Sequence, residues 1–143
     1  MKKKIKEILN KKNKSKIVCL TAYSKSVAKI LDNFMDIILV GDSMANVLYG
    51  HSNTHKISLN NILQHSTSVK MGVKKSLLVV DMPKGSYNNI KAAQKNAKLV
   101  MNKTRCDAIK IENKGDNYKI IQSLVKRKIP VMGHIGYTPQ FKK

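Results

Sequence analysis

Residues 36–43 read DIILVGDS, an apolar run that ends in Gly-Asp-Ser, and this stretch decides which fold the rest of the chain fits. An uninterrupted apolar run of this length predicts a strand buried on both faces. The same arrangement recurs at residues 76–83, SLLVVDMP, and at residues 108–113, AIKIEN. The sequence has only 8 acidic residues against 28 lysines and arginines, yet each run ends close to one of them. These carboxylates are Asp42, Asp81 and Glu112.

Two further apolar runs extend the pattern toward both ends of the chain. Residues 16–23, KIVCLTAY, predict another buried strand, and residues 129–136, IPVMGHIG, predict a fifth strand. Between these runs lie segments whose apolar residues recur every three or four positions, as is typical of amphipathic helices. The sequence therefore predicts a βα unit repeated four times and followed by a single strand.

Each predicted helix begins after a residue whose side chain can cap it. The helix after residues 44–57, which are expected to form a polar loop, should stop near Gly72. The apolar side of the first helix consists of Val27, Ile30, Leu31 and Phe34. The capping residues are Ser24, Ser58, Asn88 or Asn89, and Asp116.

Apolar strands that alternate with single helices imply parallel pairing through right-handed crossovers. Two architectures satisfy this order, a doubly wound sheet and a (β/α)8 barrel. In both, binding and catalytic groups collect at the carboxyl ends of the strands. Neither a glycine-rich dinucleotide loop nor a P-loop is present in the sequence. We therefore expect a non-nucleotide site on one rim of the sheet, with contributions from Asp42, Asp81, Glu112 and His134.

The chain of 143 residues has the length of one domain, and 42% of its residues are hydrophobic, enough for a buried core. We expect a single domain over residues 1–143, with a basic helix in residues 1–15 and the strand and helix units in residues 16–136. Cys19 and Cys106 show no metal-ligand spacing, so both are expected to be buried, reduced thiols. No apolar stretch has the length of a membrane span and no signal peptide is recognisable, which predicts a cytoplasmic protein.

The net charge of +20 raises the alternative of a nucleic-acid partner. Against it, the lysines are dispersed, only Arg105 and Arg127 offer a guanidinium fork, and aromatic residues make up 5% of the chain. Dispersed positive charge gives weak, salt-sensitive association rather than a specific site. The expected partner is therefore a small molecule, not a nucleic acid or a membrane.

Carboxylates that share one rim suit a hard divalent cation, and Mg²⁺ is the metal that such oxygen ligands favour. A cation bound in this way leaves positions for water and substrate, and it can polarise the carbonyl group of a 2-oxo acid so that enolisation becomes accessible. Lys110 lies two residues before Glu112, on the same side of its strand. We expect Lys110 to pair with the substrate carboxylate or to stabilise the oxyanion.

Each of these residues also has a purely structural alternative. A strand-end aspartate such as Asp42 often caps the next helix or binds loop amides. Lys110 could form an ion pair with a neighbouring carboxylate, and His134 could be a hydrogen-bonded core imidazole. The residues alone leave both interpretations open.

Six short motifs follow one another along the chain: TAYS (21–24), ILVGDSM (38–44), YGHSNT (49–54), DMPKGSY (81–87), IKIEN (109–113) and GHIGYTPQ (133–140). In this order and spacing they closely resemble the ketopantoate hydroxymethyltransferase family, whose members are (β/α)8 barrels. The resemblance covers essentially the whole chain. It implies hydroxymethyl transfer from 5,10-methylenetetrahydrofolate to 3-methyl-2-oxobutanoate, giving 2-dehydropantoate for pantothenate and coenzyme A biosynthesis, with Mg²⁺ as the cofactor.

The resemblance also implies roles for individual residues. Asp42, Asp81 and Glu112 match the acidic residues around the metal. The oxo acid is expected to contact Asp42, Ser43, Asp81 and Lys110. His134 matches a histidine of the active-site rim.

Two positions depart from the family pattern, since Ala45 stands where glycine is usual and Lys84 stands where an apolar residue is usual. Both departures are expected to affect loops rather than metal ligands.

The predicted elements reach only the fifth strand, whereas a complete barrel needs about 250 residues. By the resemblance, the general base is a glutamate of a later strand, so no catalytic base is expected within residues 1–143. We expect a truncated barrel of about five strands and four helices that keeps the metal and oxo-acid side of the site, lacks the folate side and shows little or no turnover alone. Full-length members are expected to form homo-oligomers. The alternative is a non-catalytic basic remnant that binds nucleic acid or serves in assembly.

Overall fold

The computed structural model describes residues 3–142, so residues 1, 2 and 143 of the predicted domain lie outside the described residues. Its centre is a sheet of five strands in the order β1-β2-β3-β4-β5, and each strand pairs in parallel with the next. This is the parallel sheet that the sequence predicts. The strands are β1 (Cys19–Thr21), β2 (Ile37–Val40), β3 (Leu77–Asp81), β4 (Ala108–Glu112) and β5 (Val131–His134).

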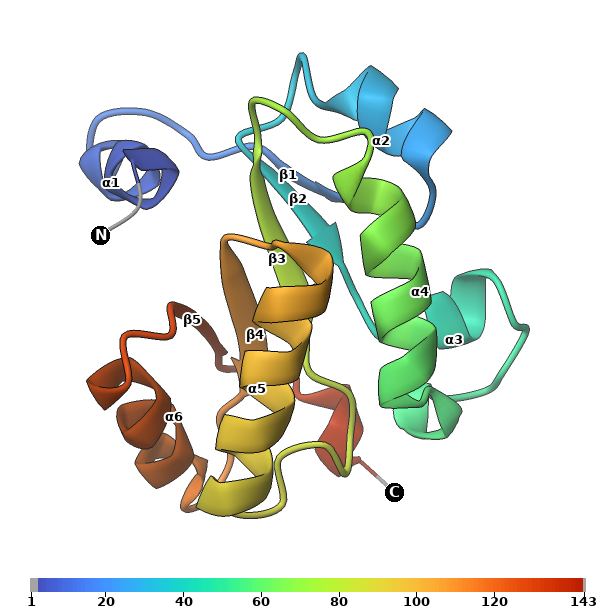
Figure 1. The fold of residues 1–143 in the computed structure, drawn as a ribbon, viewed down its shortest axis with the longest axis vertical. Coiled ribbons are helices and arrows are strands. Elements are labelled where there is room, and N and C mark those ends of the chain that lie inside the picture. The colour runs from blue at the N-terminus through green and yellow to red at the C-terminus, as the bar shows by residue number, and fades with distance from the viewer. Residues whose placement is uncertain (1–2, 143) are drawn as a thin grey trace.

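Each of the four connections between strands contains one of the predicted helices, and these helices form one layer outside the sheet (Figure 1). Neighbouring helices contact one another in sequence order, from α2 to α4, α5 and α6. A strand order without reversal and a single connecting layer are typical of a barrel wall and not of a doubly wound sheet. The helices are α2 (Lys25–Leu31), α4 (Leu59–Lys70), α5 (Ile90–Thr104) and α6 (Asn117–Lys126).

The opposite face of the sheet is covered at one end by the predicted basic helix, α1 (Lys3–Asn10). Ile5 and Ile8 of this helix pack against a small apolar cluster on the sheet. The ammonium group of Lys4 donates hydrogen bonds to the carbonyl oxygens of Lys74 and Ser76 at 2.8 and 2.7 Å. The cluster residues are Ile37, Leu77, Val79 and Ala108.

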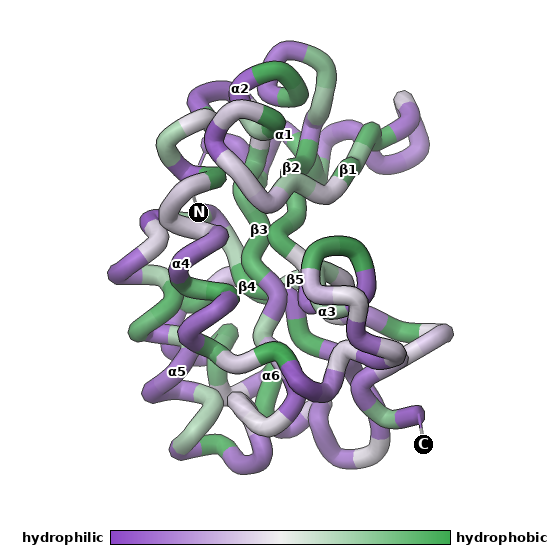
Figure 2. Tube along the Cα trace, turned by 90° about the vertical axis from the view of Figure 1, so that its right-hand side faces the viewer, coloured by the Kyte–Doolittle hydropathy of each residue, from purple (hydrophilic) through white to green (hydrophobic). Residues whose placement is uncertain are grey.

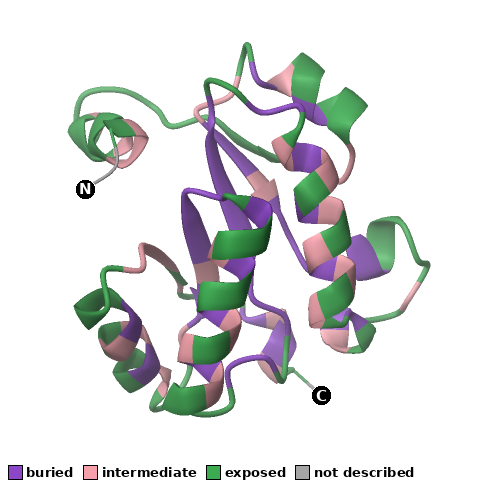
Figure 3. Ribbon diagram, in the orientation of Figure 1, coloured by how far each residue is buried: buried purple, intermediate pink, exposed green. Residues whose placement is uncertain are grey.

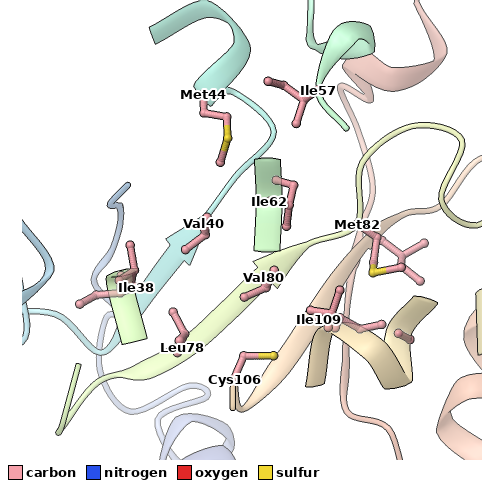
Figure 4. Close-up of a cluster of buried hydrophobic side chains, with 14 of the residues drawn as sticks. Ile38, Val40, Met44, Ile57, Ile62, Leu78, Val80, Met82, Cys106 and Ile109 are labelled. Carbon is pink, nitrogen blue, oxygen red and sulfur yellow. The ribbon is translucent and has the colours of Figure 1, made fainter. Parts of the chain in front are cut away.

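The main core lies between the sheet and the connecting helices. Figure 2 shows that the hydrophobic segments concentrate along the central strands, and Figure 3 shows that the same segments are buried. Helix α4 contributes Ile62, which is fully buried against the strands. No helix within residues 3–142 is both long and apolar enough to cross a membrane. The residues labelled in Figure 4 are Ile38, Val40, Met44, Ile57, Ile62, Leu78, Val80, Met82, Cys106 and Ile109.

The prediction that residues 16–23 form a buried strand is wrong about burial, because β1 is exposed throughout its length. Leu20 is 50% exposed, and Cys19 is an exposed thiol, whereas Cys106 is buried as predicted. The physical reason is the position of β1 at the edge of the sheet, where β2 is its single strand partner among residues 3–142. An apolar run indicates a strand but does not indicate how many neighbours that strand has.

The predicted apolar side of the first helix is likewise largely exposed. In α2 only Ala28 is buried, Leu31 is partly buried, and Ile30 is 66% exposed. Phe34, which follows the helix, is 71% exposed. Helix α2 packs against α4, and the apolar residues of α2 that point away from this contact are exposed.

The helix caps follow the prediction with one exception. Ser24, Ser58 and Asn89 each accept a backbone hydrogen bond in the first turn of their helices, and Ser58 forms a capping box with Asn61. Asp116 stands at the N-cap of α6 but makes no capping hydrogen bond. Its carboxylate instead forms an exposed ion pair with the ammonium group of Lys119, at 3.2 Å.

The predicted polar loop at residues 44–57 is more ordered than expected. It contains the short helix α3 (Met44–Val47) and a 3-10 turn, η1 (Thr54–Lys56). Met44 and Ala45 of α3 are fully buried, which explains why this part of the loop folds against the core. Helix α3 and turn η1 contact each other and form a wall beside the carboxyl end of β2.

Asp32 links the end of α2 to the segment before β3. Its carboxylate, 6% exposed, accepts hydrogen bonds from the backbone N–H groups of Lys74, Lys75 and Ser76 at 2.9 to 3.0 Å. Burial acts to raise the pKa of Asp32, but the backbone donors outweigh it and hold the pKa below its ordinary value of 3.8. The ionised carboxylate therefore stabilises the folded chain.

We expect Asp32→Asn to lower the free energy of unfolding by about 2 kcal/mol, because buried N–H donors lose a charged acceptor. Since the folded pKa is lowered, the contribution of Asp32 is present above pH 3.8 and is lost as the pH falls through the folded pKa. Urea denaturation at neutral and acidic pH measures this difference. Asp116→Asn is the matched control and should change stability by less than about 0.5 kcal/mol.

Candidate functional site

The predicted acidic residues and His134 lie at the same end of the sheet. Asp81 ends β3, Glu112 ends β4, and Asp42 follows β2 by two residues. The register pairs Asp81 with Lys110 and Glu112 with His134 on adjacent strands. Parallel strands bring their carboxyl ends together, so local strand positions are sufficient to gather these groups on one rim.

Asp81 and Lys110 form a buried ion pair. The ammonium nitrogen of Lys110 lies 2.6 Å from Oδ2 of Asp81, and Asp81 is 1% exposed. The structural alternative for Lys110, pairing with a neighbouring carboxylate, is thus confirmed. Burial raises the pKa of Asp81 to about 7, while the charge of Lys110 acts in the opposite direction. The other oxygen, Oδ1, is buried and has no hydrogen-bond partner within residues 3–142.

Glu112 is fully buried and only half satisfied. Its Oε2 accepts a hydrogen bond from the backbone N–H of Gln140 at 3.1 Å, whereas Oε1 has no such partner among the described residues. Burial raises the pKa of Glu112. Nδ1 of His134 lies 3.5 Å from Oε1 without a hydrogen bond, and burial lowers the pKa of His134. His134 is therefore favoured as a neutral imidazole beside a buried acid.

Gln140 is the central residue that sequence reasoning missed. It belongs to a 3-10 turn, η2 (Pro139–Phe141), and is fully buried. Its amide nitrogen donates hydrogen bonds to Oδ2 of Asp42 at 2.9 Å and to the carbonyl oxygen of Met82 at 3.0 Å. Its amide oxygen accepts a hydrogen bond from the hydroxyl of Tyr87. In Figure 1 this turn is the red segment next to the C-terminus.

Ser43 is held by a second tyrosine. The hydroxyl groups of Ser43 and Tyr23 lie 2.8 Å apart. Ser43 stands at the N-cap of α3 but makes no capping hydrogen bond, so its hydroxyl is not committed to the helix. Asp42 and Ser43 both line a cavity of about 730 Å³. Tyr23, Tyr87 and Gln140 all lie inside the motifs TAYS, DMPKGSY and GHIGYTPQ, which was the available signal for them.

The charge of the cluster suits a divalent cation. When ionised, Asp42, Asp81 and Glu112 bring three negative charges, and Lys110 supplies one positive charge while His134 is favoured as neutral. Three carboxylates against one ammonium group leave an excess of two negative charges in a buried place, and either protonation of an acid or a bound cation would compensate it. Orphaned oxygens of Asp81 and Glu112 are the atoms that such a cation would satisfy.

A closed cage of protein ligands is nevertheless absent from residues 3–142, where no group of three or more His, Cys, Asp or Glu side chains has the geometry to hold one ion. Mg²⁺ does not require such a cage, because it commonly binds one or two carboxylates and retains several waters. The arrangement therefore fits Mg²⁺ bound by part of the cluster, with water and substrate completing its shell.

Comparison with known sequences agrees with the family resemblance of the six sequence motifs. The profile of the family described as ketopantoate hydroxymethyltransferase matches residues 2–143. A 3-methyl-2-oxobutanoate hydroxymethyltransferase of Pelagibacter ubique (strain HTCC1062) is 55% identical over 140 residues, covering 98% of this chain and 54% of that protein. One of the same name from Rhizobium etli is 47% identical over 125 residues, covering 87% of this chain and 46% of that protein. The chain thus spans about half the length of the curated relatives it matches.

Solved structures support the fold at much lower identity. Phosphonopyruvate hydrolase in complex with oxalate and Mg²⁺ superposes with a TM-score of 0.70 at 14% identity, covering 93% of this chain and 52% of that chain. The trigonal crystal form of 2,3-dimethylmalate lyase, a member of the PEP mutase/isocitrate lyase superfamily, gives 0.64 at 12% identity, with coverages of 93% and 51%. These similarities confirm the predicted barrel-type α/β fold, of which the chain forms about half.

We expect Gln140→Ala to lower the free energy of unfolding by about 3 kcal/mol, because Asp42 and Tyr87 lose buried partners at once. Urea denaturation followed by circular dichroism measures the loss. Gln122→Ala, at an exposed position of α6, removes the same side chain without a buried network and is the control. Equal stability losses in the two variants would contradict the role assigned to Gln140.

Proposed function

Because the chain belongs to the ketopantoate hydroxymethyltransferase family, we propose that it forms the metal-binding and oxo-acid-binding half of an enzyme that transfers a hydroxymethyl group to 3-methyl-2-oxobutanoate. The donor would be 5,10-methylenetetrahydrofolate and the product 2-dehydropantoate, a precursor of pantothenate. One observation carries this proposal. Buried carboxylates with unpartnered oxygens lie together on the rim of the sheet, in a chain whose relatives are named 3-methyl-2-oxobutanoate hydroxymethyltransferase.

Asp42 and Asp81 are proposed to hold Mg²⁺ together with water, and Glu112 lies beside them as the third acid of the cluster. The metal would polarise the oxo group of the substrate and favour its enolisation. The phosphonopyruvate hydrolase structure, which contains oxalate and Mg²⁺, supports this choice of metal and of a small oxygen-rich acid on a similar fold. Burial raises the pKa of Asp81, and a bound cation would offset this desolvation of its carboxylate.

Lys110 and Ser43 are proposed to bind the oxo acid itself. Lys110 is 2.6 Å from Asp81, so its ammonium group is already directed at the place where the acid and the metal would meet. Ser43 offers a hydroxyl that is oriented by Tyr23 at 2.8 Å. Together they would fix the carboxylate and stabilise negative charge that develops on the oxo oxygen. His134 is proposed as part of the rim, beside Glu112.

We propose that proton abstraction from the substrate depends on a glutamate outside residues 1–143, which is compatible with a chain that spans about half the length of its relatives. On this proposal, residues 1–143 tested by themselves are expected to bind the oxo acid without turning it over. A cytoplasmic location and a homo-oligomeric full-length enzyme belong to the same proposal. Nucleic acid is not proposed as a partner.

We expect calorimetric titration of the chain with 3-methyl-2-oxobutanoate to show binding heat only when Mg²⁺ is present. Asp81→Asn should weaken this binding at least about tenfold, since it removes a metal ligand. Asp116→Asn removes one negative charge at an exposed site, as Asp81→Asn does at the buried one, and should leave the affinity for the oxo acid unchanged. Heat that does not depend on Mg²⁺, from a sample with folded circular dichroism, would contradict the proposal.

Removal of metal provides an independent readout. If Mg²⁺ binds the folded cluster, a concentration about a hundredfold above its dissociation constant should add about 2.7 kcal/mol to the free energy of unfolding. Thermal melts with excess MgCl₂ and with a chelator should therefore differ by several degrees, and NaCl at matched ionic strength should not reproduce the shift. The difference should disappear in Asp81→Asn.

A further inference from the structure

A histidine outside the carboxylate cluster is hydrogen-bonded through both of its ring nitrogens. His65 is a half-buried residue of α4. Its Nδ1 lies 2.8 Å from the carbonyl oxygen of Tyr23, and its Nε2 lies 3.0 Å from the hydroxyl oxygen of Tyr49. The ring therefore connects the segment that follows β1 with the segment that follows α3.

The two partners decide which ring nitrogen of His65 carries the proton. A carbonyl oxygen only accepts hydrogen bonds, so Nδ1 donates to Tyr23. In the neutral ring Nε2 is then an acceptor, and the hydroxyl of Tyr49 is the donor. The ring of Tyr49 also meets the ring of His65 edge-on, with the centres 6.0 Å apart. His65 is thus fixed in both its position and its tautomer.

Helix α4 holds the turn between β1 and α2 at two points. Besides the contact of His65 with Tyr23, Oγ of Ser68 accepts a hydrogen bond from the backbone N–H of Lys25 at 3.1 Å. His65 and Ser68 are three positions apart, so they lie on one side of the helix. The turn needs this support because β1, which precedes it, is an exposed edge strand. The position of Tyr23 therefore depends on α4 as well as on the sheet.

The side chain of Tyr23 connects this turn to the proposed substrate site. Its hydroxyl oxygen lies 2.8 Å from Oγ of Ser43. Tyr23 is thus held at its carbonyl group by His65 and at its hydroxyl group by Ser43. A displacement of Tyr23 by about 1 Å would break the contact with Ser43, since O–H···O hydrogen bonds span roughly 2.5–3.0 Å.

We propose that His65 is a positioning residue for the oxo acid, which holds Tyr23 in place so that Tyr23 keeps the hydroxyl of Ser43 directed at the substrate. The inference rests on the proposed function and deepens it, because it assigns a role to a residue that would touch neither the metal nor the oxo acid. A purely structural histidine would change only the stability of the fold. A positioning residue changes the affinity for the oxo acid, and it does so through Tyr23.

Two substitutions separate the two hydrogen bonds of His65. The amide nitrogen of asparagine is attached to Cγ, as Nδ1 of histidine is, so His65→Asn can still donate to the carbonyl oxygen of Tyr23. The amide of glutamine lies one carbon further out, so His65→Gln can keep the contact with Tyr49 and loses the contact with Tyr23. In calorimetric titration with 3-methyl-2-oxobutanoate and Mg²⁺, His65→Gln should weaken binding about fivefold and His65→Asn less than about twofold. A loss in His65→Asn as large as in His65→Gln would overturn the inference.

A double-mutant cycle tests whether the effect passes through the hydroxyl of Tyr23. Tyr23→Phe alone should weaken oxo-acid binding about fivefold, because it removes the partner of Ser43. In this background His65→Gln should weaken binding by less than about a further twofold, because the hydroxyl that His65 positions is gone. The free energy of unfolding, measured in urea, should by contrast fall on His65→Gln in both backgrounds. Additive losses of affinity would overturn the inference and leave His65 as a structural residue.

The control is Gln64→Ala, at the exposed neighbouring position of α4, which should leave the affinity for the oxo acid unchanged. Magnesium-dependent binding by the unaltered chain, with the same affinity in His65→Gln, overturns only the present inference. Absence of magnesium-dependent oxo-acid binding by the folded, unaltered chain overturns the proposed function and this inference with it.

Discussion

Buried negative charge at the tips of apolar strands is the constraint on which the rest of this structure depends. Asp81 and Glu112 are almost completely removed from water, and such burial disfavours ionised carboxylates unless hydrogen bonds or opposite charges compensate. Lys110 supplies one ammonium group and Gln140 supplies a backbone donor, and one oxygen of each acid has no hydrogen-bond partner among residues 3–142. This incomplete compensation distinguishes a binding site from an ordinary structural ion pair.

The fold delivers these groups to one place through simple geometry. Every strand runs in the same direction and pairs with its neighbour in sequence, so each strand end adds a side chain to the same rim. The turn that carries Gln140 then folds under that rim and ties Asp42 to Met82 and Tyr87. The hydrogen-bond network at the rim thus depends on a segment that follows β5.

The sheet is well packed in its middle and open at its first edge. Strands β2 and β3 are almost entirely buried, whereas β1 and the outer side of α2 expose apolar residues such as Leu20, Ile30 and Phe34. In a closed barrel the first strand pairs with the last one and such residues are covered. The exposure on this side agrees with a chain that spans about half the length of its relatives.

The elements and the acidic rim were predictable from the sequence, because both follow from local patterns. Apolar runs placed β2, β3 and β4, capping residues placed the helix starts, and the residue at each strand end placed the carboxylates. Tertiary structure alone decided which apolar residues are covered, and it joined Gln140 to Asp42 across 98 positions of the chain. The periodicity of apolar residues shows which side of a helix or strand is apolar. The element that packs against that side comes from a segment distant in sequence. The same is true of the polar atom that forms a hydrogen bond with a buried acid.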